Sequence, residues 1–287
     1  MAQLTDRAPF VQGGTIMHLR DRIKRFALRF LPERLLQNLK KIHYARSLRQ
    51  TDPVAEPDLL VVRHLIAPGH RVIDVGANVG LYTKFMAGLV GPWGKVYSIE
   101  PMPQTYEILS SNIDKLGLIN VEAFNVAASS EDGFVQMQVP HYTTGGENYY
   151  EARIVAEPAA GDLRTVQVHA RTLDSLFGPE DRIDFVKCDV EGHERSCLAG
   201  AVELLQTARP AWLIEISSNP DQRDSGAAEV FALLTRHGYE PYWFDGRHLN
   251  RRRPGDRSVN YFFLTAVHLA RLPAGLMQPS RPTRRAA

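Results

Sequence analysis

An acidic residue and two glycines lie around the end of the first predicted strand, in a pattern suited to binding a cation. The segment 71–75 predicts a buried strand, and Asp74, Gly76, Ala77, Asn78 and Gly80 lie at its end or just beyond it. Glycines four residues apart let the turn pass close to a ligand, and a helix predicted from residue 80 to 89 points free N–H groups at it. The turn lacks the dinucleotide pattern G-x-G-x-x-G, and a carboxylate at Asp74 repels a pyrophosphate but attracts an amine or a sulfonium. An anionic cofactor is therefore disfavoured.

The next two predicted strands each end in a residue suited to binding part of a nucleoside. Glu100 follows the strand 95–99, and Pro101 then breaks that strand. A carboxylate at this position accepts hydrogen bonds from both hydroxyls of a ribose, although a surface acid at a strand end is the simpler alternative. Asn125 and Val126 end the third strand, where a side-chain amide can reach an adenine or its ribose.

The segment 184–194 places charged residues inside an otherwise apolar strand. Lys187 and Asp189 share one face of this strand, while Cys188 faces the other side. Buried charges are costly unless they are paired or functional. His193 and Glu194 open the next helix, and Glu215 ends the neighbouring strand. We expect these residues, together with Glu191, to converge on one cleft, although His193 and Glu194 can also serve only the helix start.

The elements that must position these residues alternate between strand and helix from residue 58 onward. Short β-branched runs at 71–75, 95–99, 121–126, 183–190 and 211–216 are separated by segments with helical periodicity, including 194–205. This rhythm predicts an α/β fold with a mostly parallel sheet covered on both faces, and two last strands at 239–244 and 258–265 predict an antiparallel edge. Ligands of such sheets bind at the carboxyl ends of the strands, where the residues above lie.

Several of these segments resemble those of the FkbM-type methyltransferases. The resemblance lies in VIDVGANVGLYT (72–83), SIEP (98–101), NVAA (125–128), WLIEI (212–216) and, most specifically, DFVKCDVEGHE (184–194), and it covers roughly residues 58–265. It implies a Rossmann-like class I methyltransferase fold with a seven-stranded sheet, and S-adenosylmethionine as cofactor. By this resemblance Asp74, Gly76, Asn78 and Gly80 hold the methionine end, Glu100 the ribose and Asn125 the adenine side. Ala77, Tyr82, Pro101, Val126 and Asp189 complete the expected cofactor site.

Methyl transfer to an alcohol requires alignment of the reactants and removal of a proton from the hydroxyl group. His193 is the best general base by intrinsic pKa and Asp189 is the best placed, with Lys187 and Glu215 as further catalytic candidates. A divalent cation on Asp189 and Glu215 is an alternative, which the absence of a dedicated ligand spacing in the sequence disfavours. Cys188 faces away from the cleft and is not expected to act as a nucleophile.

The resemblance implies that the acceptor is a hydroxyl group of a small molecule or glycan, such as a sugar, a polyketide or another secondary metabolite. Two alternatives stay open: a methyltransferase acting on RNA or protein, and a non-catalytic scaffold that docks to a membrane or partner. Nucleic acid is disfavoured because no RNA-binding signature accompanies Arg251–Arg253. A dehydrogenase is disfavoured by the glycine pattern. Residues 141–163, with Tyr142, Tyr149 and Tyr150, form either a lid or a variable surface hairpin.

The chain of 287 residues divides by charge into an acidic body between two basic ends. Residues 1–50 and 247–287 each carry a net charge of +8, and residues 51–246 carry −14. We predict a basic amphipathic helical extension at 1–57, broken at Pro32, a methyltransferase domain at 58–268 and a disordered tail at 269–287. The extension packs on the main domain, lies on a membrane surface or mediates homo-oligomers. Two cysteines, no secretory signal pattern and no apolar run long enough to span a membrane predict a cytoplasmic protein.

Overall fold

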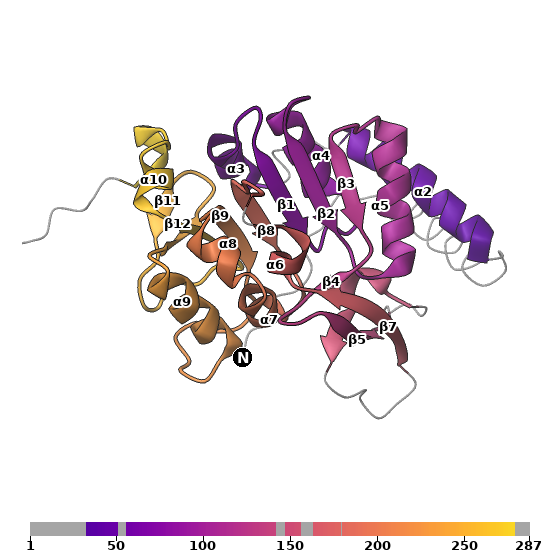
Figure 1. Cartoon of the computed structure of the whole chain (residues 1–287). Helices are drawn as coiled ribbons and strands as arrows, with labels where there is room; N and C mark the ends of the chain where they lie inside the picture. The colour runs from indigo at the N-terminus through magenta and orange to yellow at the C-terminus, as the bar shows by residue number, and fades with distance from the viewer. Residues whose placement is uncertain (1–32, 51–55, 142–146, 156–162, 179, 279–287) are drawn as a thin grey trace, which may run out of the picture.

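A computed structural model describes residues 33–50, 56–141, 147–155, 163–178 and 180–278. Most of the predicted N-terminal extension, parts of the predicted lid, including Tyr142, and the end of the tail lie outside these residues. Strands and helices alternate over residues 71–124 and 185–244, whereas the described part of residues 127–171 consists of successive strands and one short 3-10 turn (Figure 1). The strands are β1 (Arg71–Val75), β2 (Lys95–Ile99), β3 (Val121–Phe124), β4 (Ala127–Ala128), β5 (Gly133–Val139), β6 (Arg153–Val155), β7 (Arg164–Arg171), β8 (Phe185–Cys188), β9 (Ala211–Glu215), β10 (Glu240–Phe244), β11 (Leu249–Arg251) and β12 (Asn260–Leu264).

The helices connect the strands and cover the main sheet. They are α2 (Glu33–Gln50), α3 (Leu59–Leu65), α4 (Leu81–Val90), α5 (Pro103–Leu116), α6 (Leu173–Leu176), α7 (Glu194–Ala199), α8 (Val202–Gln206), α9 (Gly226–Arg236) and α10 (Ala266–Leu269), with short 3-10 turns η2 (Tyr149–Glu151) and η3 (Ala274–Leu276). The predicted single helix at 194–205 was wrong, because the chain breaks into α7 and α8 at Gly200. A Cβ at Gly200 would come within 2.0 Å of the Ser129 carbonyl oxygen, so the break packs tightly on a neighbouring loop.

The main sheet has the order β11-β10-β12-β9-β8-β1-β2-β3. Strands β3, β2, β1, β8 and β9 are parallel, and β12 is antiparallel to both of its neighbours, β9 and β10. The Rossmann-like architecture and its antiparallel edge are therefore confirmed, with β11 as an eighth strand beyond the seven expected. The order reverses between β1 and β8, which is the switch point where ligands of open α/β sheets bind.

Alternation along each strand divides the core into two layers. Ile73 and Val75 of β1 join the buried cluster that includes residues of α7, α8 and α9, while Val72 joins the cluster under α3 and α4. Burial on both faces explains why the central strands read as continuous apolar runs. A buried lysine within such a run, as in β8, is then exceptional.

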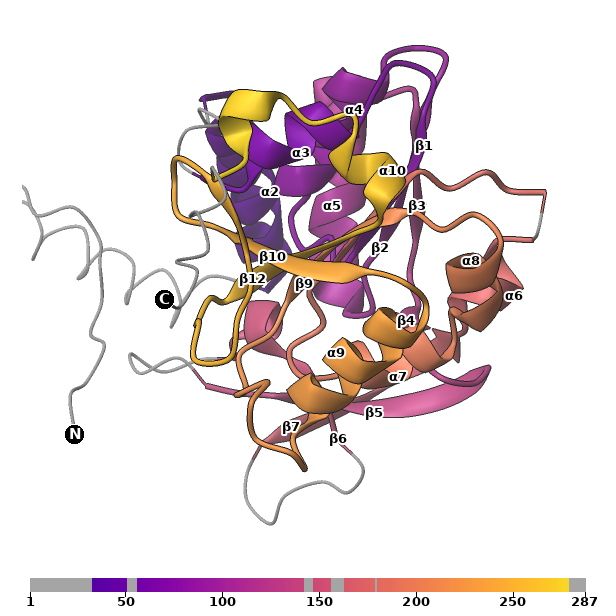
Figure 2. The same cartoon turned by 90° about the vertical axis from the view of Figure 1, so that its left-hand side faces the viewer.

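A second sheet of order β4-β7-β5-β6 lies beyond the ends of the main strands, below the main sheet in both views of Figures 1 and 2. The alternating segments predicted at 134–139 and 165–170 form its β5 and β7, which pair antiparallel. Met137 and Val139 of β5 pack with Met102, directly after β2, in a third buried cluster. This sheet thus forms a wall beside the carboxyl end of β2.

Helix α2 packs against α5 on the outside of the domain. Lys41 pairs with Glu107 at 3.0 Å, the Arg49 guanidinium donates to the Lys115 carbonyl at 2.7 Å, and Lys84 of α4 donates to the Leu48 carbonyl. For residues 33–50, the interpretation of the basic N-terminal segment as a helix packed on its own domain is therefore confirmed. No helix in the described ranges is long and apolar enough to cross a membrane.

Candidate active site at the carboxyl ends of β1, β2, β8 and β9

The turn after β1 packs closely against other segments of the same chain. Gly76 has a φ of +74°, and a Cβ on it would lie 1.7 Å from the backbone oxygen of Asp189. Gly80 has a φ of +96° and caps α4, and a Cβ there would meet the Leu109 side chain at 2.8 Å. Close packing on backbone thus favours glycine at 76 and the positive φ favours it at 80, whereas the sequence suggested only close approach to a ligand.

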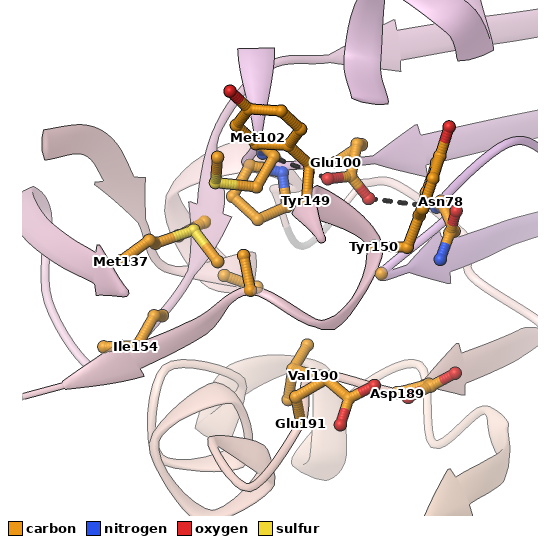
Figure 3. A pocket seen from close by; sticks show the side chains of 15 residues that line it. Asn78, Glu100, Met102, Met137, Tyr149, Tyr150, Ile154, Asp189, Val190 and Glu191 are labelled. Carbon is orange, nitrogen blue, oxygen red and sulfur yellow. Dashed lines mark hydrogen bonds between the residues drawn. The ribbon is translucent and has the colours of Figure 1, made fainter. Parts of the chain in front are cut away.

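Glu100 is held as a buried acceptor beside this turn. Its two carboxylate oxygens accept hydrogen bonds from the backbone N–H groups of Asn78 and Met102, each at 3.0 Å. Only 6% of Glu100 is exposed, and this burial raises its pKa to about 7. Figure 3 shows the carboxylate between Asn78 and Met102, on the cavity wall. Each oxygen has a second lone pair, so the group can still accept from a ligand hydroxyl.

The Asn125 side chain contacts the backbone of the segment that carries Glu100. Its side-chain amide donates to the carbonyl oxygens of Glu100 and Pro101 at 2.8 and 3.0 Å. Val126 packs against the buried core. Asn125 thus holds the segment that presents Glu100 and does not line the Glu100 cavity, and its place at the adenine side stays a prediction.

Asp74 is fully buried under the turn. The Thr83 hydroxyl donates to its Oδ2 at 2.6 Å and lies 2.8 Å from the Ser98 hydroxyl. The other oxygen, Oδ1, is buried and has no hydrogen-bond partner among the described residues. Burial raises the pKa of Asp74, and the nearby Lys187 ammonium partly counteracts this rise. An acceptor oxygen without a donor is costly in an interior, and a donor from a ligand would remove that cost.

Lys187 and Asp189 form an ion pair at the end of β8. The ammonium donates to Asp189 Oδ2 at 2.9 Å and lies 4.9 Å from the ring centre of Tyr82. Lys187 lies beside Asp74 in the register of β8 and β1. Burial disfavours the charge on Lys187, but the carboxylates of Asp189 and Asp74 outweigh it and raise the lysine pKa. The two carboxylates therefore favour the charged form of the lysine, which holds the Asp189 carboxylate.

Glu215 ends β9, the strand next to β8. Burial raises its pKa to about 7, and the negative charge of Asp189 adds to the rise. A carboxyl group with this pKa is deprotonated in about half of the molecules at neutral pH and accepts a proton readily. Its raised pKa makes Glu215 a candidate general base.

Two cavities meet at these residues. The Glu100 cavity has a volume of about 60 Å³, and its wall includes Met102, Met137, Tyr149, Tyr150, Ile154 and Val190 (Figure 3). The Glu215 cavity has a volume of about 290 Å³, and its wall includes Glu56, Tyr82, Lys187, Glu215 and Asn260. Both are lined by Gly76, Asn78 and Asp189. The three shared residues thus stand between a space beside Glu100 and a space beside Glu215.

The second sheet contributes residues that sequence reasoning missed. Met137 and Ile154 come from β5 and β6, and Tyr149 and Tyr150 come from η2. Figure 3 shows the two tyrosine rings over the Glu100 side of the cavity. The tyrosines were noted as ring-bearing, but the methionine and isoleucine carry no signal of function. The Glu100 cavity is narrow because these side chains fill it, well below the roughly 300 Å³ of a typical ligand pocket.

His193 and Glu194 line neither cavity. His193 Nε2 lies 3.0 Å from the Ser129 hydroxyl, and burial lowers the histidine pKa. Glu194 accepts a hydrogen bond from the Gly192 backbone N–H at 2.9 Å and is buried. Both contacts brace the turn between β8 and α7. The structure therefore does not bring His193 to Asp189 as the expected base.

Asp189 and Glu215 were the alternative ligands for a divalent cation. Within the described chain, no group of three or more His, Cys, Asp or Glu residues is placed to hold a metal ion. Cys188 and Cys197 are both buried and free.

Residues 74–241, more than half of the chain, match the family model described as the Methyltransferase FkbM domain. The chain is 26% identical over 239 residues to the AMB antimetabolite synthetase AmbE of Pseudomonas aeruginosa, covering 71% of this chain but only 11% of AmbE. It is 25% identical over 235 residues to the hexuronic acid methyltransferase AglP of Haloferax volcanii, covering 78% of this chain and 84% of AglP. A solved methyltransferase FkbM from Methylobacillus flagellatus is 16% identical, with 78% of this chain and 58% of that chain covered at a TM-score of 0.43.

Proposed function

The chain belongs to the FkbM methyltransferase family, and we propose that it transfers the methyl group of S-adenosylmethionine to a hydroxyl oxygen of a small molecule or glycan. The observation that carries this proposal is the meeting of two cavities at Gly76, Asn78 and Asp189. In one cavity Glu100 can accept hydrogen bonds from the hydroxyls of a nucleoside. The other cavity holds the candidate general bases. The donor and the acceptor molecule would therefore approach each other beside Asp189.

The residues present fit the cofactor in their polar chemistry. Glu100 is a buried carboxylate with free acceptor capacity for ribose hydroxyls, and Asp74 keeps one buried oxygen without a donor. The narrow Glu100 cavity requires side chains to shift when a nucleoside enters, and we expect Tyr149 and Tyr150 to move aside. When bound, S-adenosylmethionine supplies a methyl group made electrophilic by its positively charged sulfur.

The chain's own residues then have separate tasks. Glu215, with its pKa of about 7, takes the proton from the acceptor hydroxyl at its carboxylate oxygen. Asp189, fixed by Lys187, accepts a hydrogen bond from a neighbouring hydroxyl of the acceptor molecule and so orients the reacting oxygen. Lys187 remains charged and keeps Asp189 in place. Tyr82, which packs against the Lys187 ammonium, closes the wall of the Glu215 cavity.

Two relatives support a sugar or secondary-metabolite acceptor. AglP is named a hexuronic acid methyltransferase and aligns over most of its length. AmbE is named an antimetabolite synthetase, but this chain spans about a tenth of it, so only a segment of AmbE is comparable. A cytoplasmic location, assembly through N-terminal helices and the domain boundaries near residues 57 and 268 stay predictions.

Calorimetry with S-adenosylhomocysteine and the full chain tests the cofactor assignment. We expect binding by the wild-type protein and its loss in Asp74→Ala, with Asp74→Asn as an isosteric variant and thermal unfolding to confirm that both fold. Micromolar affinity retained in both variants would contradict the role of Asp74.

Radiolabelled S-adenosylmethionine and a panel of alcohols then test methyl transfer, and NMR of the product locates the methyl group. A methyl group on nitrogen or carbon would overturn the proposal of O-methylation.

A further inference from the structure

One wall of the Glu215 cavity comes from residues outside the matched family segment. Glu56 precedes α3 and Asn260 begins β12, whereas the family match ends at residue 241. Asn260 lies opposite Glu215 in the antiparallel register of β12 and β9. This wall faces the space that we assign to the acceptor, so its chemistry bears on which acceptor fits.

The orientation of the Asn260 side chain is determined by a buried carboxylate. Asn260 Nδ2 lies 2.7 Å from Oδ2 of Asp58, which is 8% exposed. A carboxylate oxygen only accepts hydrogen bonds, so Asn260 must turn its NH₂ group toward Asp58 and its carbonyl Oδ1 away from it. Within the described residues, no other side-chain hydrogen bond engages this amide. Asn260 lines the cavity, and its Oδ1, turned away from Asp58, is the oxygen of this amide left to accept a hydrogen bond.

The polar side chains around the Glu215 cavity are mostly hydrogen-bond acceptors. Acceptor oxygens come from the side chains of Asn260, Glu56, Asp189 and Glu215, whereas the Asn78 amide both donates and accepts. The ammonium of Lys187 is engaged by Asp189 and the Tyr82 ring. The Tyr82 hydroxyl can donate one hydrogen bond, and burial together with nearby acids raises its pKa, so it stays protonated. A ligand here must bring its own donors.

We propose, on the basis of the proposed methyl transfer, that Asn260 and Glu56 select a neutral or amino-substituted sugar or polyol as acceptor. Hydroxyl and ammonium groups donate to these oxygens. A carboxylate or phosphate would be desolvated against like charges, which costs affinity and suppresses wrong partners. Asp58 acts as a positioning residue, because it decides which end of the Asn260 amide faces the cavity.

Binding of four related sugars tests this selection directly. The full chain, saturated with S-adenosylhomocysteine, is titrated with glucose, glucosamine, glucuronate and glucose 6-phosphate at pH 8, with saturation-transfer NMR as the readout. We expect the two anionic sugars to bind at least about tenfold more weakly than glucose and glucosamine. Anionic sugars that bind as well as glucose, or no binding of any of the four, would overturn the inference.

Three variants connect the selection to the named residues. Glu56→Lys should reduce the preference for glucose over glucuronate to about threefold or less, while Glu131→Lys, on an exposed loop, should leave it unchanged. Asp58→Asn lets the Asn260 amide turn either way and should also relax the preference. Asn260→Asp should favour glucosamine over glucose. If Asp58 had only a structural role, Asp58→Asn would instead weaken the binding of all four sugars equally. That result would contradict its positioning role.

The outcomes separate this inference from the proposed function. Failure of the wild-type chain to bind S-adenosylhomocysteine would contradict the proposed function itself. Normal binding of that cofactor product, combined with equal affinity for charged and neutral sugars, would contradict only the selection by Asn260 and Glu56.

Discussion

Gly76 lies directly against the backbone of Asp189, so close that a Cβ on Gly76 would approach the Asp189 carbonyl oxygen to 1.7 Å. The turn after β1 and the end of β8 are therefore one unit at the switch point of the sheet. A side chain at position 76 would collide with backbone, which has no flexible end through which to yield. Gly76 and Asp189 line both cavities, so this contact lies where the two cavities meet.

Gly76→Ala should disrupt this unit. The clash and the positive φ together should lower the free energy of unfolding by at least about 2 kcal/mol and weaken S-adenosylhomocysteine binding. Gly88→Ala is the matched control, because it lies within α4 with open space around it, and should raise stability by roughly 0.5–1 kcal/mol. Denaturant unfolding and calorimetry measure both effects. Wild-type stability in Gly76→Ala would argue against the contact.

Glu100→Gln should weaken S-adenosylhomocysteine binding by roughly 10- to 100-fold, because charge-assisted hydrogen bonds are about twice as strong as neutral ones. Binding by the wild-type chain should also weaken as the pH falls below about 7, where Glu100 takes up its proton. Glu122→Gln on β3, in a partly exposed pair with Lys95, serves as the control. An unchanged dissociation constant in Glu100→Gln would exclude a ribose role.

The rate of methyl transfer at saturating cofactor should rise with pH and level off above about pH 7. A general base acts only in its deprotonated form, and the pKa of Glu215 is about 7. The rate should therefore fall as the pH drops below about 7. Glu215→Gln should lower kcat by roughly 10²- to 10⁴-fold and remove this pH dependence. A pH profile that persists unchanged in the variant would assign the base elsewhere.

Lys187→Met should be strongly destabilising. The lysine is 7% exposed and offsets the charges of Asp189 and Asp74, so its removal leaves buried carboxylates without a cation. Breaking a buried pair in this way costs roughly 3–5 kcal/mol, which thermal or denaturant unfolding detects. The double variant Lys187→Met with Asp189→Asn should recover part of that loss. No recovery would mean that the two side chains are not coupled.

His193→Gln should leave kcat within about threefold of the wild-type value, because the ring contacts Ser129 and lines neither cavity. Steady-state assays at pH 8 are sufficient for this comparison. A fall of a hundredfold or more would restore His193 as a base, and would require α7 to reorient when substrates bind.

The sequence by itself determined the sheet architecture and the strand-end positions of Asp74, Gly76, Glu100, Asp189 and Glu215. Strand ends can be located from alternation and turn residues, and parallel strands deliver their ends to one edge. Local pattern does not specify side-chain partners. Asn125 was expected at the adenine and His193 as a candidate base, and the structure shows them hydrogen-bonded to backbone carbonyls and to Ser129.

Only the tertiary structure decided what surrounds those strand ends. Asp58 and Asn260 are 202 residues apart and touch because β12 inserts beside β9. Met137 and Ile154 reach the Glu100 cavity because the second sheet lies beyond β2. Such contacts depend on how distant segments pack, and packing follows from the summed burial of the whole core, which no short stretch of sequence contains.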